Sequence, residues 1–228
     1  MFENPFTSES KKAKKSLFDK KPKNLSLARK VSAEMTEKIK PADLYYEHEF
    51  RINREQATFL YALEDQLVRD YVENDKNITK NEARKIIYDR LNYLSVCKIN
   101  EQGQIIVLNL NCLNLTCIPE QIEKLVNLQE FSCESNQLQF LPEEITQLIN
   151  LHSLLIGNNK IKKLPKNIGN LINLYSLECL GNLLRSVPKS IAKLNETLKF
   201  IDFTKNKFRN KEKDKISKIL PNTDIYYK

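Results

Sequence analysis

A segment of 23 residues is repeated without gaps along the second half of the chain, and this repeat constrains the fold more than any other feature. Successive copies start at Ile105, Leu128, Leu151 and Leu174, and a shortened fifth copy starts one residue late, at Leu198. Each full copy approximates the pattern L-x-x-L-x-L-x-x-N-x-L-x-x-L-P-x-x-I-x-x-L. Self-similarity at such a period is typical of proteins built from stacked structural units. The repeat therefore predicts a solenoid in which each unit packs on its neighbours.

The apolar and polar positions within a copy indicate how one unit folds. The L-x-L alternation predicts a short strand with one buried face, and successive copies are expected to pair in a parallel sheet. An Asn follows the strand in copies two to five, where a buried amide can satisfy backbone groups of a neighbouring turn. These residues are Asn136, Asn159, Asn182 and Asn206. The following Pro suits an irregular return segment without sheet N–H groups. Cys133 and Cys179 occupy Leu positions, so we expect buried, unreactive thiols.

Over roughly residues 105–208, the chain resembles the leucine-rich-repeat family in its 23-residue LPxxIxxLxxL class. The resemblance implies an α/β solenoid, a leucine-rich-repeat horseshoe with a parallel β-sheet on the concave face. We assign about five repeats to residues 101–208. The first copy departs from the pattern because Leu113 stands at the Asn position, as expected for a terminal repeat that meets a cap.

Residues 25–100 are predicted to form an α-helical N-terminal region that ends in a helical-hairpin cap. In residues 53–95, apolar residues at three- and four-residue steps predict an amphipathic helix after the expected N-cap Asn53. Its stripe consists of Leu60, Leu63, Leu67 and Tyr71. Thr79 and Glu82 have the spacing of a capping box, which predicts the start of a second helix.

Residues 209–228 are predicted to form a C-terminal cap. A short helix is expected to end at Pro221, and the strand-like sequence DIYY then covers the last edge of the sheet.

The net charge of +8 is concentrated at the two ends of the chain. Residues 1–40 carry 11 basic and 5 acidic side chains, whereas residues 199–228 carry 9 and 4. The composition of residues 1–24 is typical of a basic, disordered arm. No apolar run reaches a signal-peptide core or the roughly 20 residues of a membrane span. Five cysteines at irregular spacing favour reduced thiols in a cytosol.

No pattern in the chain indicates catalysis. The glycines form no phosphate-binding loop, and His48 and His152 lie in unrelated contexts, so no nucleophile and base can be paired. Cys112 and Cys117 lack the further ligands that a zinc site needs. We therefore expect no enzyme activity, no metal or other cofactor and no small-molecule substrate.

The concave face is the expected binding surface, because outward-pointing strand residues line it in this class of repeat. The candidate residues are Val107, Asn109, Asn111, Glu130, Ser132, Glu134, Ser153, Leu155, Ser176, Glu178, Leu180, Phe200, Asp202 and Thr204. They include four acids and no base, which argues against nucleic acid on this face. Leu155, Leu180 and Phe200 are expected to lie close together as an apolar protein-binding patch. The alternative is that each is a singly exposed apolar residue.

These features predict a monomeric protein-interaction module that binds one protein partner. The helical N-terminal region and the absence of a signal peptide resemble leucine-rich-repeat effectors of intracellular bacteria, Legionella-type proteins among them. That resemblance implies a virulence protein secreted into the host cytoplasm by a route independent of signal peptides. Small eukaryotic intracellular repeat proteins share the motif. Two alternatives stay open: an adaptor that recruits signalling or ubiquitin-ligase machinery through its N-terminal helices, and attachment of residues 1–40 to membrane or nucleic acid.

Overall fold

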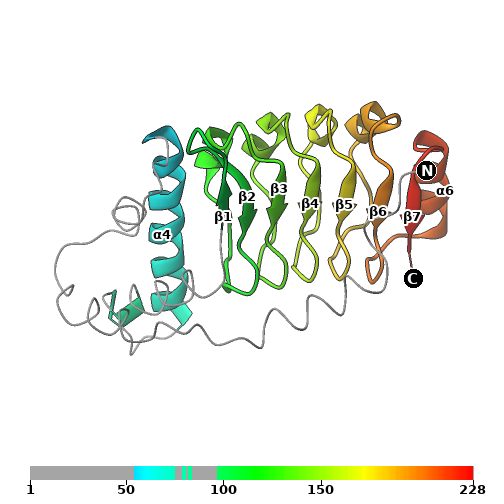
Figure 1. Ribbon diagram of the computed structural model, residues 1–228. Helices are drawn as coiled ribbons and strands as arrows, with labels where there is room; N and C mark the ends of the chain where they lie inside the picture. The colour runs from blue at the N-terminus through cyan, green and yellow to red at the C-terminus, as the bar shows by residue number, and fades with distance from the viewer. Residues whose placement is uncertain (1–53, 75–78, 81, 84–96, 228) are drawn as a thin grey trace, which may run out of the picture. The chain divides into compact units, whose positions relative to one another are not determined.

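The structure is a computed structural model of the 228-residue chain. It describes residues 54–74, 79–80, 82–83 and 97–227. The predicted arm at residues 1–24 and the predicted helix at residues 25–40 lie outside the described residues. The described part contains one sheet whose strands β1 to β7 follow each other in chain order (Figure 1).

The repeat produces a parallel sheet, as its period predicts. The strands are β2 (Ile105–Asn109), β3 (Glu130–Ser132), β4 (Ser153–Leu155), β5 (Ser176–Glu178), β6 (Phe200–Asp202) and β7 (Asp224–Tyr226), each parallel to the next. β1 (Cys97–Ile99) pairs with β2 in the antiparallel direction. Residues at the same position of successive copies lie opposite each other in neighbouring strands. Glu130, for example, pairs with Ser153, so each position of the repeat forms a straight row across the sheet.

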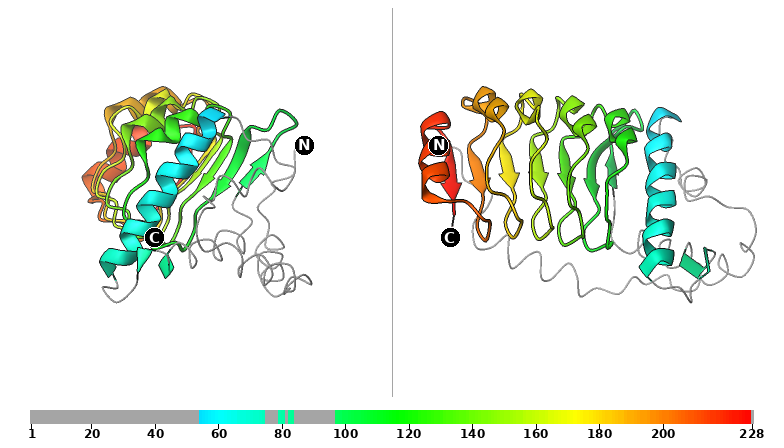
Figure 2. Two further views of the ribbon diagram at one scale, coloured as in Figure 1. Left: turned by 90° about the vertical axis from the view of Figure 1, so that its left-hand side faces the viewer. Right: turned by 180° about the vertical axis from the view of Figure 1, so that it is seen from behind.

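A 3₁₀ turn forms the return half of each full coil. The turns are η1 (Glu120–Lys124), η2 (Glu143–Gln147), η3 (Ile168–Asn170) and η4 (Lys189–Leu194). Pro119, Pro142 and Pro188 each directly precede a turn, in agreement with the predicted place of proline. Figures 1 and 2 show the turns grouped along one side of the stack.

The repeat leucines form one common interior. The residues in one row across the strands are all 0% exposed, namely Leu108, Phe131, Leu154, Leu177 and Ile201. The half of each coil that returns from the strand contributes its own apolar residues to the same core. Each coil therefore buries its apolar residues against its neighbours, as expected of a unit that has no core of its own.

The repeated asparagine connects each coil to the preceding one. Asn136 Nδ2 donates to the carbonyl of Leu110 at 2.8 Å, and its Oδ1 accepts the N–H groups of Leu113 and Leu115 at 3.0 Å. Asn159, Asn182 and Asn206 make equivalent bonds one coil further along each time. The prediction that the amide satisfies backbone groups of a neighbouring turn is confirmed.

The same bonds explain why Leu113 replaces asparagine in the first copy. The amide of a later copy reaches back to the coil before it, and the first coil has no such coil to reach. An asparagine there would be buried without these partners, at a cost of roughly 1–3 kcal/mol for each unsatisfied group. Leu113 is instead 1% exposed and adds to the core.

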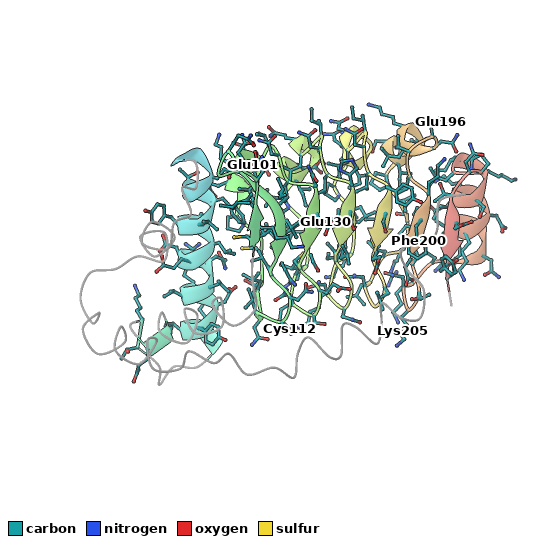
Figure 3. The ribbon with its side chains drawn as sticks, in the orientation of Figure 1. Glu101, Cys112, Glu130, Glu196, Phe200 and Lys205 are labelled. Carbon is teal, nitrogen blue, oxygen red and sulfur yellow. The ribbon has the colours of Figure 1, made fainter. Side chains whose placement is uncertain are left out.

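A residue with positive φ lies three residues after the end of each strand from β2 to β6. These residues occupy one column of the repeat: Cys112 (60°), Ser135 (56°), Asn158 (54°), Gly181 (65°) and Lys205 (54°). Left-handed backbone turns the chain sharply away from the sheet, and glycine adopts it at no steric cost. Figure 3 shows Cys112 and Lys205 at the same edge of the sheet, where this turn begins.

Helix α4 (Arg54–Asn74) covers the first coil, so the predicted N-terminal cap is present in its first helix. Its predicted apolar stripe is confirmed, because Leu60, Leu63 and Leu67 are buried in the core shared with the repeats. Phe59, which the stripe did not include, is also 0% exposed.

Two buried polar residues of α4 connect its ends to the first coil. Gln56 Oε1 accepts the N–H of Ile105 at 2.9 Å, and this N–H lies on the edge of β2. Asp70 accepts both the N–H of Thr116 at 3.0 Å and its hydroxyl at 2.6 Å. The two contacts are 14 residues apart, or about 21 Å along a helix, so α4 spans the coil.

The predicted start of a second helix is also confirmed in part. Thr79 and Glu82 form a capping box in which the Glu82 carboxylate accepts the Thr79 N–H at 2.8 Å. Thr79 Oγ1 accepts the Glu82 N–H at 3.3 Å. These bonds lower the pKa of Glu82. Asn53 and the remainder of the predicted second helix lie outside the described residues.

The C-terminal end has the predicted helix and strand. Helix α6 (Asn210–Ile219) packs Ile216 into the core, and β7 pairs with β6. No helix in the described segments is long and apolar enough to cross a membrane.

Candidate functional site

The outward-pointing residues of the strands and of the positions just after them form the sheet face. Every residue of the predicted site lies on this face, because the register aligns the columns of the repeat. Figure 3 shows Glu130 and Phe200 over the strands of the face, three strands apart. The geometry therefore brings the predicted residues onto one surface.

The candidate residues differ in how much of their side chain is accessible. Glu130 is exposed, and most of the others are half-buried. Ser176 is only 4% exposed, so the structure leaves little of its side chain available to a partner. This short side chain lies in a row between Ser153 and the much larger Phe200. The burial of Ser176 depends on side chains of the neighbouring coils, so its position in the repeat did not predict it.

Hydrogen bonds within the sheet face hold several of its polar side chains. Asn111 Oδ1 accepts the hydroxyl of Ser132 at 2.7 Å and the N–H of Glu134 at 2.6 Å. Asn109 Oδ1 accepts the Asn111 N–H at 3.0 Å. These bonds fix the side chains at the β2–β3 end, so a partner meets a pre-organised polar surface there.

The apolar residues of the sheet face form two groups instead of one patch. Leu155 on β4 and Leu180 just after β5 are diagonal neighbours, and Leu180 leans over Gly157. Its Cδ2 lies 2.9 Å from the place where a Cβ on Gly157 would be. The missing side chain at Gly157 thus makes room for Leu180.

Phe200 lies apart from Leu155 and Leu180, contrary to expectation. Its row neighbour on β5 is Ser176, and its ring packs on Tyr226 of β7 with the centroids 5.2 Å apart. Tyr226 is 50% exposed, so it extends the sheet face with a second aromatic ring. The repeat could not place Tyr226, because β7 is not a copy of the repeat.

The sheet face is acidic. Its four predicted acids are Glu130, Glu134, Glu178 and Asp202. β7 adds Asp224, which lies opposite Phe200, and β1 adds the exposed Lys98, which lies opposite Val107. Neither addition was predicted, because both strands lie outside the repeat pattern. Acids around half-buried leucine side chains and the exposed Tyr226 are complementary to a surface that is basic and apolar.

The cysteines show the expected separation between buried and exposed thiols. Cys133 and Cys179 are 0% exposed, and burial raises the pKa of each thiol well above its ordinary value. The prediction that the thiols at these Leu positions are buried is confirmed. Cys112 is exposed, whereas partial burial raises the pKa of Cys117. Within the described segments, no cluster of three or more His, Cys, Asp or Glu residues could hold a metal ion.

Comparison with known proteins identifies the fold. A scan against protein-family models and a search of curated proteins found no match. Among solved structures, the chain is similar to a leucine-rich-repeat protein of Leptospira interrogans, with 40% identity and a TM-score of 0.47. That match covers 48% of this chain and 28% of the other.

Two eukaryotic structures are also similar. The leucine-rich-repeat ectodomain of the Arabidopsis thaliana receptor kinase GASSHO1/SCHENGEN3, solved with CASPARIAN STRIP INTEGRITY FACTOR 2, has 24% identity and a TM-score of 0.50. The match covers 61% of this chain and 18% of that one. The Drosophila melanogaster SNF/U2A′ complex matches with 20% identity over 61% of this chain and 82% of the other, at a TM-score of 0.47. Together with the sheet and turns described above, the likeness to the GASSHO1/SCHENGEN3 ectodomain, at a TM-score of 0.50, shows a leucine-rich-repeat fold.

Proposed function

We propose that the chain is a non-enzymatic protein-interaction module that binds one protein partner through its sheet face. The observation that carries this proposal is the composition of that face. Its acids surround the half-buried pair Leu155 and Leu180, and the side chains stand on a rigid, hydrogen-bonded sheet. Apolar anchors within a polar surround are typical of protein interfaces.

The charge of the sheet face specifies the chemistry of the partner. Five acids lie on the strands or directly after them, and Lys98 is the cation that β1 adds. A partner with Lys or Arg side chains beside an apolar segment would complement this surface. These acids would instead repel a phosphate backbone, so nucleic acid is not a suitable ligand for this face.

The decisive experiment compares two matched double variants in quantitative affinity capture from cell lysate. Leu155→Arg with Leu180→Arg adds two cations to the sheet face. The control, Val126→Arg with Ile149→Arg, adds the same charge at two apolar residues that are 53% and 50% exposed and lie between a 3₁₀ turn and the next strand. We expect the sheet-face variant to lose specific proteins that the control retains. Equal retention by both variants would refute the proposal.

The cellular setting is a further part of the proposal. The resemblance to effectors of intracellular bacteria supports a protein that acts in a host cytosol after secretion without a signal peptide. A translocation reporter fused to the full chain tests this directly in infected cells. Delivery above the background of a secretion-deficient strain is expected, and background-level delivery would remove the effector role without affecting the sheet-face proposal.

The adaptor alternative makes a different use of the N-terminal helices. It requires an apolar helix face that is available to recruited machinery, whereas α4 buries Leu60, Leu63 and Leu67 against the first coil. This burial favours a capping role for α4. Recruitment would then depend on residues outside the described part of the chain, and their deletion would abolish capture of the recruited proteins but not of the sheet-face partner.

A further inference from the structure

A strip of basic side chains follows the edge at which the strands end, on a surface separate from the sheet face. We define the basic strip as Lys160, Lys162, Arg185, Lys207 and Arg209, all of which are exposed. They lie on the extended segments that leave the left-handed turns of the third, fourth and fifth coils. Figure 3 labels Lys205, two residues before the last of these segments.

Backbone hydrogen bonds hold the three segments side by side. The N–H of Lys160 donates to Leu138 in the second coil at 2.8 Å, and Leu183 and Lys207 repeat this bond in the next two coils at 2.9 and 2.8 Å. Within each segment the central residue, such as Ile161 or Leu184, points into the core. The residues on either side of it therefore project outward in fixed rows.

One of these rows contains a cation in three consecutive coils. Lys162, Arg185 and Arg209 occupy the same position of the repeat, about 4.8 Å apart from coil to coil at the spacing of paired strands. Like charges placed opposite each other are unfavourable in a paired ladder. The ion pairs found in the described residues join Lys124 to Glu123 and Lys215 to Glu212, so neither neutralises this row.

The first two coils show that the repeat itself does not require these cations. The equivalent outward positions there are Asn114 and Thr116 in the first coil and Gln137 and Gln139 in the second. These four side chains are neutral and exposed. The positive charge is thus an addition confined to the C-terminal coils.

Helix α6 extends the basic strip into a groove. Arg185, Lys207 and Arg209 line a groove of about 1100 Å³. Lys211, Lys215 and Lys218 of α6 line it too, together with Glu212 and Asp214. Six cations against two acids leave the groove strongly positive.

We propose that the basic strip binds the phosphodiester backbone of a nucleic acid strand without reading its base sequence. A linear row of cations matches a ligand that carries one charge at every unit along its length. The aromatic residue between Lys207 and Arg209 is Phe208, which is half-buried and packs its ring on Phe203 and Tyr227, so it is not presented for stacking on a base. An acidic protein would need exposed apolar anchors for tight binding, whereas Leu183 and Phe208 beside the strip are half-buried.

The test measures binding of the full chain to a fluorescent oligothymidylate of about 20 nucleotides over a range of salt concentrations. The strip variant is Lys162→Gln, Arg185→Gln, Arg209→Gln. The control is Lys166→Gln, Lys189→Gln, Lys193→Gln, which removes the same charge from exposed lysines near the 3₁₀ turns. Any contribution of the basic residues 1–40 is common to both variants.

We expect the strip variant to bind at least about tenfold more weakly at roughly 0.1 M salt, and the slope of log K against log salt to become shallower by about 2. The single change Arg185→Gln, a milder perturbation, should reduce that slope by about 0.7. The control should change neither quantity comparably. Equal weakening by both triple variants, absence of binding, or tighter strip-dependent binding to polyglutamate or phosphatidylserine vesicles would overturn the proposal.

Discussion

Asn159 shows at the scale of one residue how each coil is joined to the coil before it. Its Oδ1 accepts the N–H of Leu138, and its Nδ2 donates to the carbonyls of Cys133, Ile156 and Gly157. These backbone groups belong to two successive coils and are buried. The extra residue between Leu194 and Leu198 leaves the equivalent bonds of Asn206 intact, so the bonds fix the strand and the turn after it, whereas the return half of a coil tolerates a change in length.

We predict that Asn159→Ala lowers the free energy of unfolding by about 2–4 kcal/mol, because it leaves several buried backbone groups unsatisfied. The matched control is Asn173→Ala. Asn173 is exposed and donates one bond, to the Ile149 carbonyl at 2.8 Å, so its loss should cost about 0.5–1 kcal/mol. Urea unfolding of both variants measures the difference, and equal costs would contradict the role assigned to the buried asparagine.

The buried thiols make a prediction about pH. Burial raises the pKa of Cys133 and Cys179 above the ordinary value of 9.0, so both stay protonated in the fold when the unfolded chain ionises. Their contribution to stability is therefore complete below pH 9.0 and is lost as the pH rises above it. Each group adds a slope of up to about 1.4 kcal/mol per pH unit.

Tyr227 adds to the same alkaline loss at higher pH, because burial raises its pKa from 10.0 to about 12. The double variant Cys133→Val, Cys179→Val should flatten the pH dependence of unfolding above pH 9.0 and leave the Tyr227 part unchanged. Urea midpoints across this range provide the measurement. An unchanged slope would show that the two thiols ionise equally in the folded and unfolded states.

At the scale of elements, α4 caps the first coil of a stack in which each coil depends on its neighbours for the burial of its apolar residues. The buried Leu63 is the test residue, and the exposed Asp65 on the same helix is the control. We predict that Leu63→Ala costs about 2–4 kcal/mol, whereas Asp65→Ala changes stability by less than about 0.5 kcal/mol.

The region that is destabilised tests the capping role of α4 more directly than the size of the stability loss does. Because a solenoid transmits stability mainly between neighbours, amide hydrogen exchange in Leu63→Ala should accelerate most in β2 and least in β6. Uniform acceleration across all strands, or none, would contradict a local capping role for α4.

At the scale of the whole molecule, the period explains which features were predictable. The common leucine interior, the asparagine bonds and the face of each strand residue follow from position in the repeat alone. The row of Lys162, Arg185 and Arg209 was readable in the same way, because all three occupy one column. Because the coils repeat one pattern, residues at the same position of the repeat pair across neighbouring strands, and this pairing sets the register of the sheet.

Features that depend on parts outside the repeat could not be read from it. Phe200 contacts Tyr226 because β7 joins the sheet, and no column of the repeat specifies how β7 pairs. The burial of Ser176 depends on the side chains beside it, and the position of Leu180 depends on the glycine at 157. Three-dimensional neighbours decide these details of the site.

A site-specific photo-crosslinking experiment tests the central claim, that the sheet face is the surface left free for a partner. A photoreactive phenylalanine analogue is placed at Leu180 on the sheet face and, in a separate protein, at the exposed Lys193 in η4. We predict that irradiation in lysate crosslinks one protein from position 180 and that position 193 does not capture it. Crosslinking of that protein from position 193, with none from position 180, would contradict the account.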